Sequence, residues 1–217
     1  MNDLGIMFGT VHSFNNLGLR WLGPFNIDSP DPVIKTKNIP GRDGELDYSD
    51  ALTGRVAFKN RIFSTDFEIE TKSTSDYIKK SSDITNALHA KRFRITLDTE
   101  PEFYYEGRVT VTPHKRKNER FADFTVEMDV FPYKRKKNLT QIHAHVVGKT
   151  TLCCNNLREP VVPVIKTSAP MNLTFKNRHV SVQTGTHLID FVFEEGENYI
   201  TAEGNGDIDI EYREGSL

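Results

Sequence analysis

Alternation of hydrophobic and polar residues is the dominant pattern along the chain. From Phe63 to Glu70 the bulky apolar side chains fall on every second position, with serine and carboxylates between them. A period of two places one set of side chains on each face of a β-strand. The same alternation predicts three further half-buried strands, at Phe93–Leu97, Phe103–Val111 and Phe121–Phe131.

One segment between these strands has the period of a helix instead. Tyr77, Ile84 and Leu88 recur at helical spacing and form an apolar stripe. Ser73 and Asp76 have the spacing of a capping box, with Asp in place of the usual Glu. The pattern predicts a helix over about residues 75–90, and its stripe must lie on a sheet face.

The pattern changes after Pro132. The basic stretch Lys134–Lys137 is typical of a linker, and short strands with closely spaced turn signals follow it. Gly204–Gly206 has the composition of a tight hairpin turn. The short strands predict a compact β-sandwich, at Val161–Lys166, Met171–Phe175, His179–Val182, Leu188–Phe193, Tyr199–Ala202 and Asp207–Tyr212.

The expected fold class is therefore mainly β, with one α-helix in the first of two domains. Fourteen Phe and seven Tyr among 217 residues can supply the cores of two domains, residues 1–133 and 134–217. No apolar run approaches the roughly 18 residues that span a bilayer, so we expect no membrane partner. Without a secretory leader, and with only the adjacent Cys153 and Cys154, we expect folding in a reducing cytosol.

Charge changes sign within the second domain. Residues 134–184 carry nine Lys/Arg and one acid, a balance of +8 (9 − 1), whereas residues 185–217 carry one Arg and nine acids, −8 (1 − 9). Because the whole chain has a net charge of −2, it has no global attraction to nucleic acid. The split predicts that the two segments neutralise each other across strands.

The candidate catalytic and metal-binding residues form no known constellation. His143 and His145 share a strand face and could hold a metal, but no third ligand is fixed. Cys153 has no protease signature around it. The carboxylates Glu100, Glu102, Glu194, Glu195 and Glu197 lie in solvated contexts unlike those of catalytic pairs. We expect no enzyme activity, no metal and no cofactor.

The basic clusters do not predict sequence-specific nucleic-acid binding. His114–Lys117 is predicted to lie at the tip of a hairpin, and Lys134–Lys137 in the linker. Neither has the interleaved aromatic residues of a base-stacking surface. A solvated role is favoured, and weak contact with a passing nucleic acid or an acidic partner is the alternative.

The most distinctive segment runs from Ile39 to Asp47 and continues to Ala51–Gly54. Pro40 presets the backbone for a turn, and Gly41 and Gly44 can adopt positive φ. Arg42 and Asp43 are adjacent opposite charges that could fix the loop or contact a neighbouring subunit. Turn chemistry alone predicts an ordered, charged loop.

This segment resembles the most characteristic segment of the distal tail proteins of long-tailed, non-contractile bacteriophages. The order of matching segments strengthens the resemblance: His12–Leu19 is similar to the family's opening, and Phe124–Tyr133 to the close of its N-terminal domain. The end of the chain, from Glu195 to Gly215, is similar to its last strands.

The resemblance implies an N-terminal β-sandwich with one helix and a C-terminal galectin-like β-sandwich. It implies a homo-hexameric ring at the virion's tail tip, made in the bacterial host cytoplasm, with a channel for DNA. Its implied partners are the major tail (tube) protein and the tail-tip hub, with the tape-measure and receptor-binding proteins nearby. The family-signature residues, a candidate subunit contact, are Pro40, Gly41, Arg42, Asp43, Gly44 and Leu46. The alternative function is a cell-wall carbohydrate-binding module of the tail tip.

Overall fold

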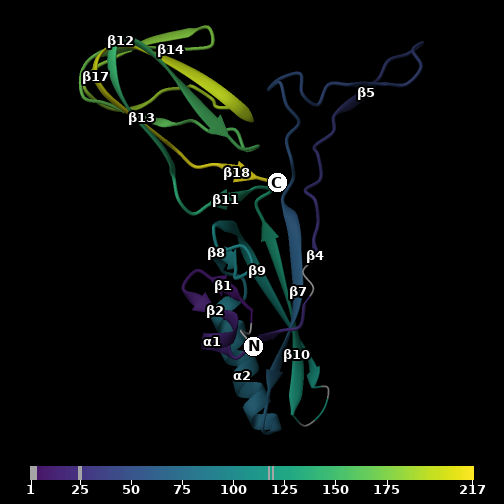
Figure 1. Cartoon of the computed structure of the whole chain (residues 1–217). Coiled ribbons are helices and arrows are strands. Elements are labelled where there is room, and N and C mark those ends of the chain that lie inside the picture. The colour runs from purple at the N-terminus through teal and green to yellow at the C-terminus, as the bar shows by residue number, and fades with distance from the viewer. Residues whose placement is uncertain (1–3, 24–25, 117, 119) are drawn as a thin grey trace. The chain divides into compact units, whose positions relative to one another are not determined.

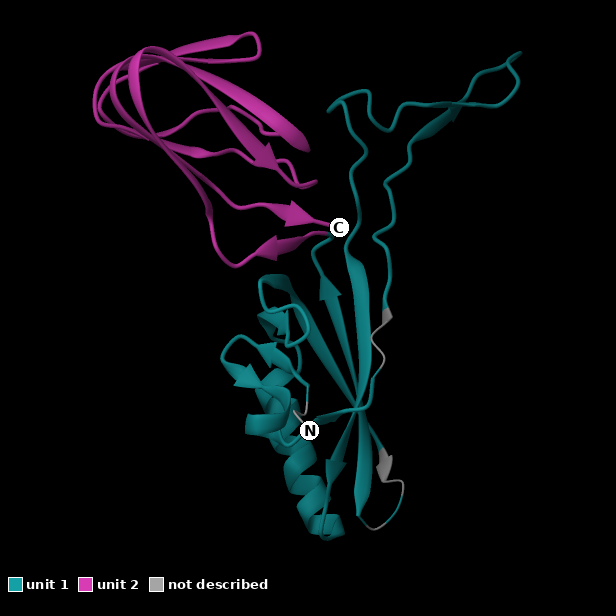
Figure 2. Cartoon of the chain, viewed as in Figure 1, with its two compact units in different colours: residues 1–132 teal, residues 133–217 magenta. Residues whose placement is uncertain are grey.

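The computed structural model describes residues 4–23, 26–116, 118 and 120–217, and confirms the mainly β class (Figure 1). The chain divides into two compact units, Met1–Pro132 and Tyr133–Leu217 (Figure 2). Among the described residues there are two helices, where the sequence predicts one. Neither of these helices has the length and apolar character needed to cross a bilayer.

Unit 1 is built on one antiparallel sheet with strand order β2-β1-β8-β9-β10-β7-β3, in which β4 also pairs with β7. A separate pair, β5–β6, lies in the connection between β4 and β7. The strands are β1 (Ile6–Phe8), β2 (Val11–His12), β3 (Arg20–Trp21), β4 (Asn26–Ile27), β5 (Thr36–Asn38), β6 (Glu45–Asp47), β7 (Arg61–Glu70), β8 (Arg92–Leu97), β9 (Phe103–Arg116) and β10 (Phe121–Val130).

The predicted alternation is what builds this sheet's buried face. β7 and β10 pair one residue to one residue over ten positions, from Glu70 opposite Phe121 to Arg61 opposite Val130. A shift of one residue would turn every apolar side chain to solvent, so the hydrophobic pattern fixes the register. Phe63, Phe67 and Phe124 are almost completely buried in the resulting core.

Helix α2 (Thr74–Leu88) occupies the region where the sequence predicts a helix, and it buries Ile84 and Leu88. Ser73 is the N-cap, and its Oγ accepts a hydrogen bond from the Asp76 N–H at 3.1 Å. The Asp76 carboxylate accepts from the Lys72 N–H, one residue before the cap. The structure thus has the capping side chains that the spacing predicts, with the return bond displaced by one residue.

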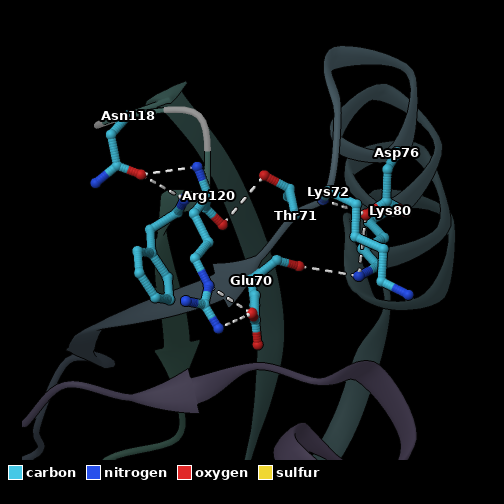
Figure 3. A network of polar contacts seen from close by, with 8 residues as sticks. Glu70, Thr71, Lys72, Asp76, Lys80, Asn118 and Arg120 are labelled. Atoms are coloured by element: carbon cyan, nitrogen blue, oxygen red, sulfur yellow. Dashed lines mark hydrogen bonds and ion pairs between the residues drawn. The ribbon is translucent and has the colours of Figure 1, made fainter.

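A polar network fastens the start of α2 to the end of the β7–β10 pair (Figure 3). Arg120 binds the Glu70 carboxylate at 2.7 Å, and the Arg120 carbonyl accepts a hydrogen bond from the Thr71 N–H at 2.6 Å. Lys80 on α2 donates to the Glu70 carbonyl and pairs with Asp76. The hydrogen bond from Arg120 lowers the pKa of Glu70. Through these contacts the position of α2 depends on the pairing of β7 with β10.

The second helix, α1 (Ser13–Leu17), is absent from the predicted elements. Its N-cap is His12, whose Nδ1 accepts hydrogen bonds from the N–H groups of Phe14 and Asn15. Histidine is not among the usual N-cap residues, and five residues are too few for a helical period to show. Tertiary contacts therefore decide this helix: His12 Nε2 lies 3.0 Å from Asp98 on a distant segment.

Unit 2 is organised around two 17-residue strands that pair along their whole length, β12 and β17. The other edge of β17 pairs first with β14 and then with β13, with β15 and β16 outside them. The strands are β11 (Lys134–Lys136), β12 (Thr140–Asn156), β13 (Val164–Thr167), β14 (Met171–Phe175), β15 (Arg178–Val182), β16 (Gly185–Leu188), β17 (Gly196–Tyr212) and β18 (Gly215–Ser216).

The β12–β17 pair bends back on itself to enclose the core. Tyr212 lies opposite Thr140 at one end of the pair, yet its hydroxyl donates to the carbonyl of Asn155 at the other end. One apolar cluster results, in which Phe193 packs edge-on against Tyr212 with ring centroids 5.1 Å apart. A strand that changes sheet at a bend is the usual corner of a two-layer β fold.

Three local predictions in this unit are wrong. The predicted strand Leu188–Phe193 is not a strand, because β16 ends at Leu188 and only Phe193 forms an isolated bridge, with Val161. Gly204–Gly206 is not a turn but lies inside β17, where a Cβ on Gly204 would come within 2.9 Å of Met171. Lys134–Lys137 is not an open linker, because its first three residues form β11 and pair with β18. Ion pairs with residues far away in the sequence hold this strand in place. Arg135 binds Glu159, and Lys136 binds Glu214 at 2.7 Å.

Candidate functional site

The most distinctive surface of unit 1 is a long arm, residues 28–60, that leaves the sheet after β4 and returns at β7. Figure 1 shows it extending past the end of β7 to β5. A Pro32–Phe58 bridge and the hydrogen bond from the Val33 N–H to the Ala57 carbonyl join its two sides near the root. No residue from 31 to 60 is buried, so the arm has no core of its own.

The tip of the arm holds the family-signature residues. Pro40 and Gly41 are the central residues of a turn closed by the hydrogen bond from the Arg42 N–H to the Ile39 carbonyl, at 3.1 Å. Gly41 has φ 81° and Gly44 has φ 76°, values that other L-residues rarely adopt. Proline followed by a positive-φ glycine is the chemistry of a type II turn. The tip is thus a built turn and not a loose connection.

The charged and apolar residues of the tip face solvent. Arg42 and Asp43 are exposed, and neither forms an ion pair with any residue that the structure describes. Leu46 on β6 lies opposite Lys37 on β5 and is also exposed. Exposed apolar side chains continue along the arm, at Ile34, Tyr48 and Leu52. Large apolar side chains on an element without a core mark a surface for another protein.

A second feature of unit 1 is an acidic sheet face, which the sequence analysis did not single out. The polar sides of β7 and β10 lie next to each other because these strands pair. Glu68 lies opposite Asp123 on one side and opposite Arg20 of β3 on the other, and Asp129 lies opposite Arg108 of β9. The acidic sheet face comprises Asp66, Glu68, Glu70, Asp123, Glu127 and Asp129. The sequence does carry a sign of this face, because carboxylates recur at alternate positions in the segments that form β7 and β10.

In unit 2, His143 and His145 do lie on one strand face, as predicted, but each contacts its own aspartate. His143 Nδ1 lies 2.6 Å from Asp209, and His145 Nδ1 lies 2.6 Å from Asp207. The Asp209 contact raises the pKa of His143. Within the described part of the chain, no three His, Cys, Asp or Glu side chains are grouped to hold a metal ion.

A groove of about 590 Å³ lies on the same face, across β12, β17, β13 and β16. Gln141 donates to Glu211 at 2.7 Å along one wall, and Lys166 lies opposite Asp209 in the register. The groove is lined by Gln141, Ile142, His143, Val164, Lys166, Thr186, Asp209 and Glu211. It offers carboxylate acceptors beside ammonium and hydroxyl donors.

Of the remaining sequence candidates, Cys153 and Glu197 both lie beside Tyr199. Cys153 is exposed, and Cys154 is buried, which raises the pKa of its thiol to about 12 and keeps it protonated. Glu197 accepts a hydrogen bond from the Tyr199 hydroxyl at 2.5 Å, and this contact raises the tyrosine pKa to about 12. Among the basic candidates, Lys117 lies outside the described residues, and His114 contacts Thr125 at 2.7 Å.

The protein is thus a mainly β protein of two units, and its most distinctive surface is the exposed arm of unit 1. The chain belongs to the family of phage tail proteins described by the RIFT-related domain, whose model matches residues 11–130. It is therefore a structural component of a phage tail. A comparison with curated proteins finds no significant match.

A solved structure with the same fold is the crystal structure of the SPP1 Dit protein. That protein is described as a paradigm of the hub adsorption apparatus in phages that infect Gram-positive bacteria. The two chains share 14% sequence identity with a TM-score of 0.66, over 97% of this chain and 98% of the SPP1 chain. The resemblance to siphophage distal tail proteins, first seen in the sequence, is confirmed by the family and by the fold.

Proposed function

We propose that this protein is a distal tail protein whose homo-hexameric ring joins the tail tube to the tail-tip hub or baseplate. Unit 1 forms the ring, and unit 2 is a galectin-like domain. The fold shared with SPP1 Dit over nearly the whole of both chains supports this role. The ring contacts the major tail protein on one side and the hub on the other, close to the tape-measure and receptor-binding proteins. The chain is synthesised in the bacterial host cytoplasm and functions in the virion.

The single observation that carries the ring proposal is the arm. It exposes apolar residues, of which Leu52 is 90% exposed, and it ends in a charged turn that has no partner among the described residues of its own chain. A contact that uses two different surfaces of the same chain closes into a ring when the rotation is right. In this proposal the arm of each subunit binds its neighbour, and the signature residues lie at that contact.

The acidic sheet face supports the DNA channel. A protein surface of negative charge repels the phosphate backbone, which otherwise dominates protein–DNA affinity. DNA can then move through a ring without binding to it.

The test is the oligomeric state of the full chain, by native mass spectrometry and by negative-stain images of tail tips. We expect six copies in a ring, either alone or after addition of the tail-tube and hub proteins. Arg42→Glu should weaken the ring and leave the monomer folded, with Lys79→Glu on the exposed side of α2 as the matched control. Tail tips that never contain six copies would exclude the ring, and an Arg42→Glu ring of normal stability would exclude that residue's role.

A second candidate function is binding of a cell-wall saccharide in the groove of unit 2. Carboxylates beside amide, ammonium and hydroxyl groups can exchange hydrogen bonds with a polyhydroxylated ligand. Calorimetric titration of the full chain with host wall polysaccharide should show saturable binding that Asp209→Asn weakens and Asp190→Asn does not. An absence of saturable binding would exclude this function.

A further inference from the structure

Arg61 is a buried cation that lacks hydrogen-bond acceptors. It is the first residue of β7, directly after the arm, and it lies on the same strand face as the buried Phe63. Only 7% of its surface is exposed, and its Nε and Nη2 atoms have no acceptor among the described residues. Buried charged groups are normally paired, because an uncompensated charge away from water is unfavourable.

The surroundings of Arg61 hold the side chain in place and partly balance its charge through Tyr105 and Glu100, but they leave Nε and Nη2 without an acceptor. Its guanidinium carbon lies 5.3 Å from the centre of the Tyr105 ring, a cation–π contact. Tyr105 is itself fixed by stacking on Phe63. An aromatic face attracts a cation but does not accept the in-plane N–H bonds of a guanidinium. The group is therefore oriented in advance, with donors that remain to be used.

The tip of the arm carries the complementary charge. Four carboxylates and two cations lie from Thr36 to Asp50, and Asp43 directly follows the turn from Ile39 to Arg42. Its carboxylate is exposed and has no partner among the described residues. Asp47, by contrast, already accepts two hydrogen bonds from Ser49, which lower its pKa.

We propose that Arg61 donates hydrogen bonds to the Asp43 carboxylate of a second copy of this chain, as the arm of one subunit reaches the arm root of the next. This proposal rests on the ring of the proposed function. An extended arm can reach about 40 Å from its root, far enough to leave its own subunit. The few hydrogen bonds that close the arm root leave it able to shift and admit the neighbour's turn. A guanidinium and a carboxylate then pair with two parallel hydrogen bonds.

The test compares association of the full chain with that of Arg61→Met, Asp43→Asn and the double variant, by sedimentation velocity over a range of concentrations. Each single variant should weaken ring association by roughly tenfold to a hundredfold. The double variant should be no weaker than Arg61→Met alone, because both changes remove one contact. Glu203→Gln and Lys149→Met, exposed residues of the β12–β17 pair in unit 2, are the matched controls, and both should associate normally.

Stability of the monomer separates this role from a purely structural one. Replacing a buried guanidinium that lacks acceptors at two nitrogens with an apolar side chain of similar length should leave the thermal midpoint unchanged or higher. If Arg61→Met does not fold, Asp43→Asn and Arg61→Lys still test the pair. Independent, additive effects of Arg61 and Asp43, or a normal ring in both variants, would overturn the proposal and leave the ring intact. A wild-type chain that never self-associates, even with its tail partners, would overturn the ring and this contact together.

Discussion

Single residues in this protein are constrained most where two strands approach each other. Gly107 on β9 lies opposite Val130 on β10, and a Cβ at this position would come within 2.2 Å of the Asp129 carbonyl oxygen. That neighbour is backbone within a ten-residue strand pair, so it cannot move aside without disturbing the register. Glycine within a strand usually lowers its stability, but at position 107 the close packing of the neighbouring strand requires it.

Gly107→Ala should consequently destabilise unit 1 by about 2 kcal/mol or more, the cost of overpacking a site that cannot relax. Chemical denaturation followed by tryptophan fluorescence measures this, since Trp21 packs against the unit 1 core. Thr110→Ala, on the polar side of the same strand, is the control and should change stability far less. Equal effects of the two substitutions would contradict the packing argument.

His143 gives a pH-dependent contribution at the same scale. Its pKa is raised by the hydrogen bond to Asp209, so the folded state binds a proton more tightly than the unfolded state. The stabilisation is complete below the unfolded pKa of about 6.5 and disappears as the pH rises through the folded value. Thermal midpoints from pH 5 to 9 should show a decline toward high pH that is smaller in His143→Gln. An unchanged profile in that variant would remove the role of the pair.

At the scale of elements, helix α2 shows local sequence signals and tertiary contacts acting together. The Ser73 cap fixes where the helix begins, and the network of Glu70, Arg120 and Lys80 fixes it against the sheet. The cap was readable from sequence, because its residues are three apart. The network was not, because Glu70 and Arg120 are 50 positions apart and meet only when β7 pairs with β10.

Ser73→Ala should lower stability by about 1 kcal/mol, the usual cost of losing an N-cap oxygen. Ser82→Ala, within the exposed side of the same helix, should be neutral or slightly stabilising, because alanine is the better helix former. Urea denaturation curves of both variants provide the comparison. Similar midpoints for the two variants would show that the cap contributes little to the folded chain.

For the whole molecule, the arm is the element that folding of the single chain does not explain. It buries none of residues 31–60 and exposes several large apolar side chains, so its order is of use only if another protein covers it. We therefore expect assembly and folding to be separable functions of this chain: the core of unit 1 should form without the arm, and the ring should not.

Replacing residues 34–56 with a short Gly-Ser connection should leave the thermal midpoint within a few degrees of the wild type and abolish the proposed hexamer. The reason is that the removed residues contribute no buried side chain to the core. Native mass spectrometry gives the assembly state, and circular dichroism gives the midpoint. A shortened chain that still forms six-membered rings would contradict this division.

The sequence by itself determined the β class, the four long strands of unit 1, the capped helix and the phage-tail family, because these follow from patterns within short segments. It misplaced Gly204–Gly206 and Lys134–Lys137, since glycine serves close strand approach as readily as turns, and since Arg135 and Lys136 are held by distant acids. Only the tertiary structure decided that the signature turn is the tip of an arm and that β7 and β10 combine their carboxylates on one face. Such features depend on strand pairing between distant segments, and no local period records which segments pair.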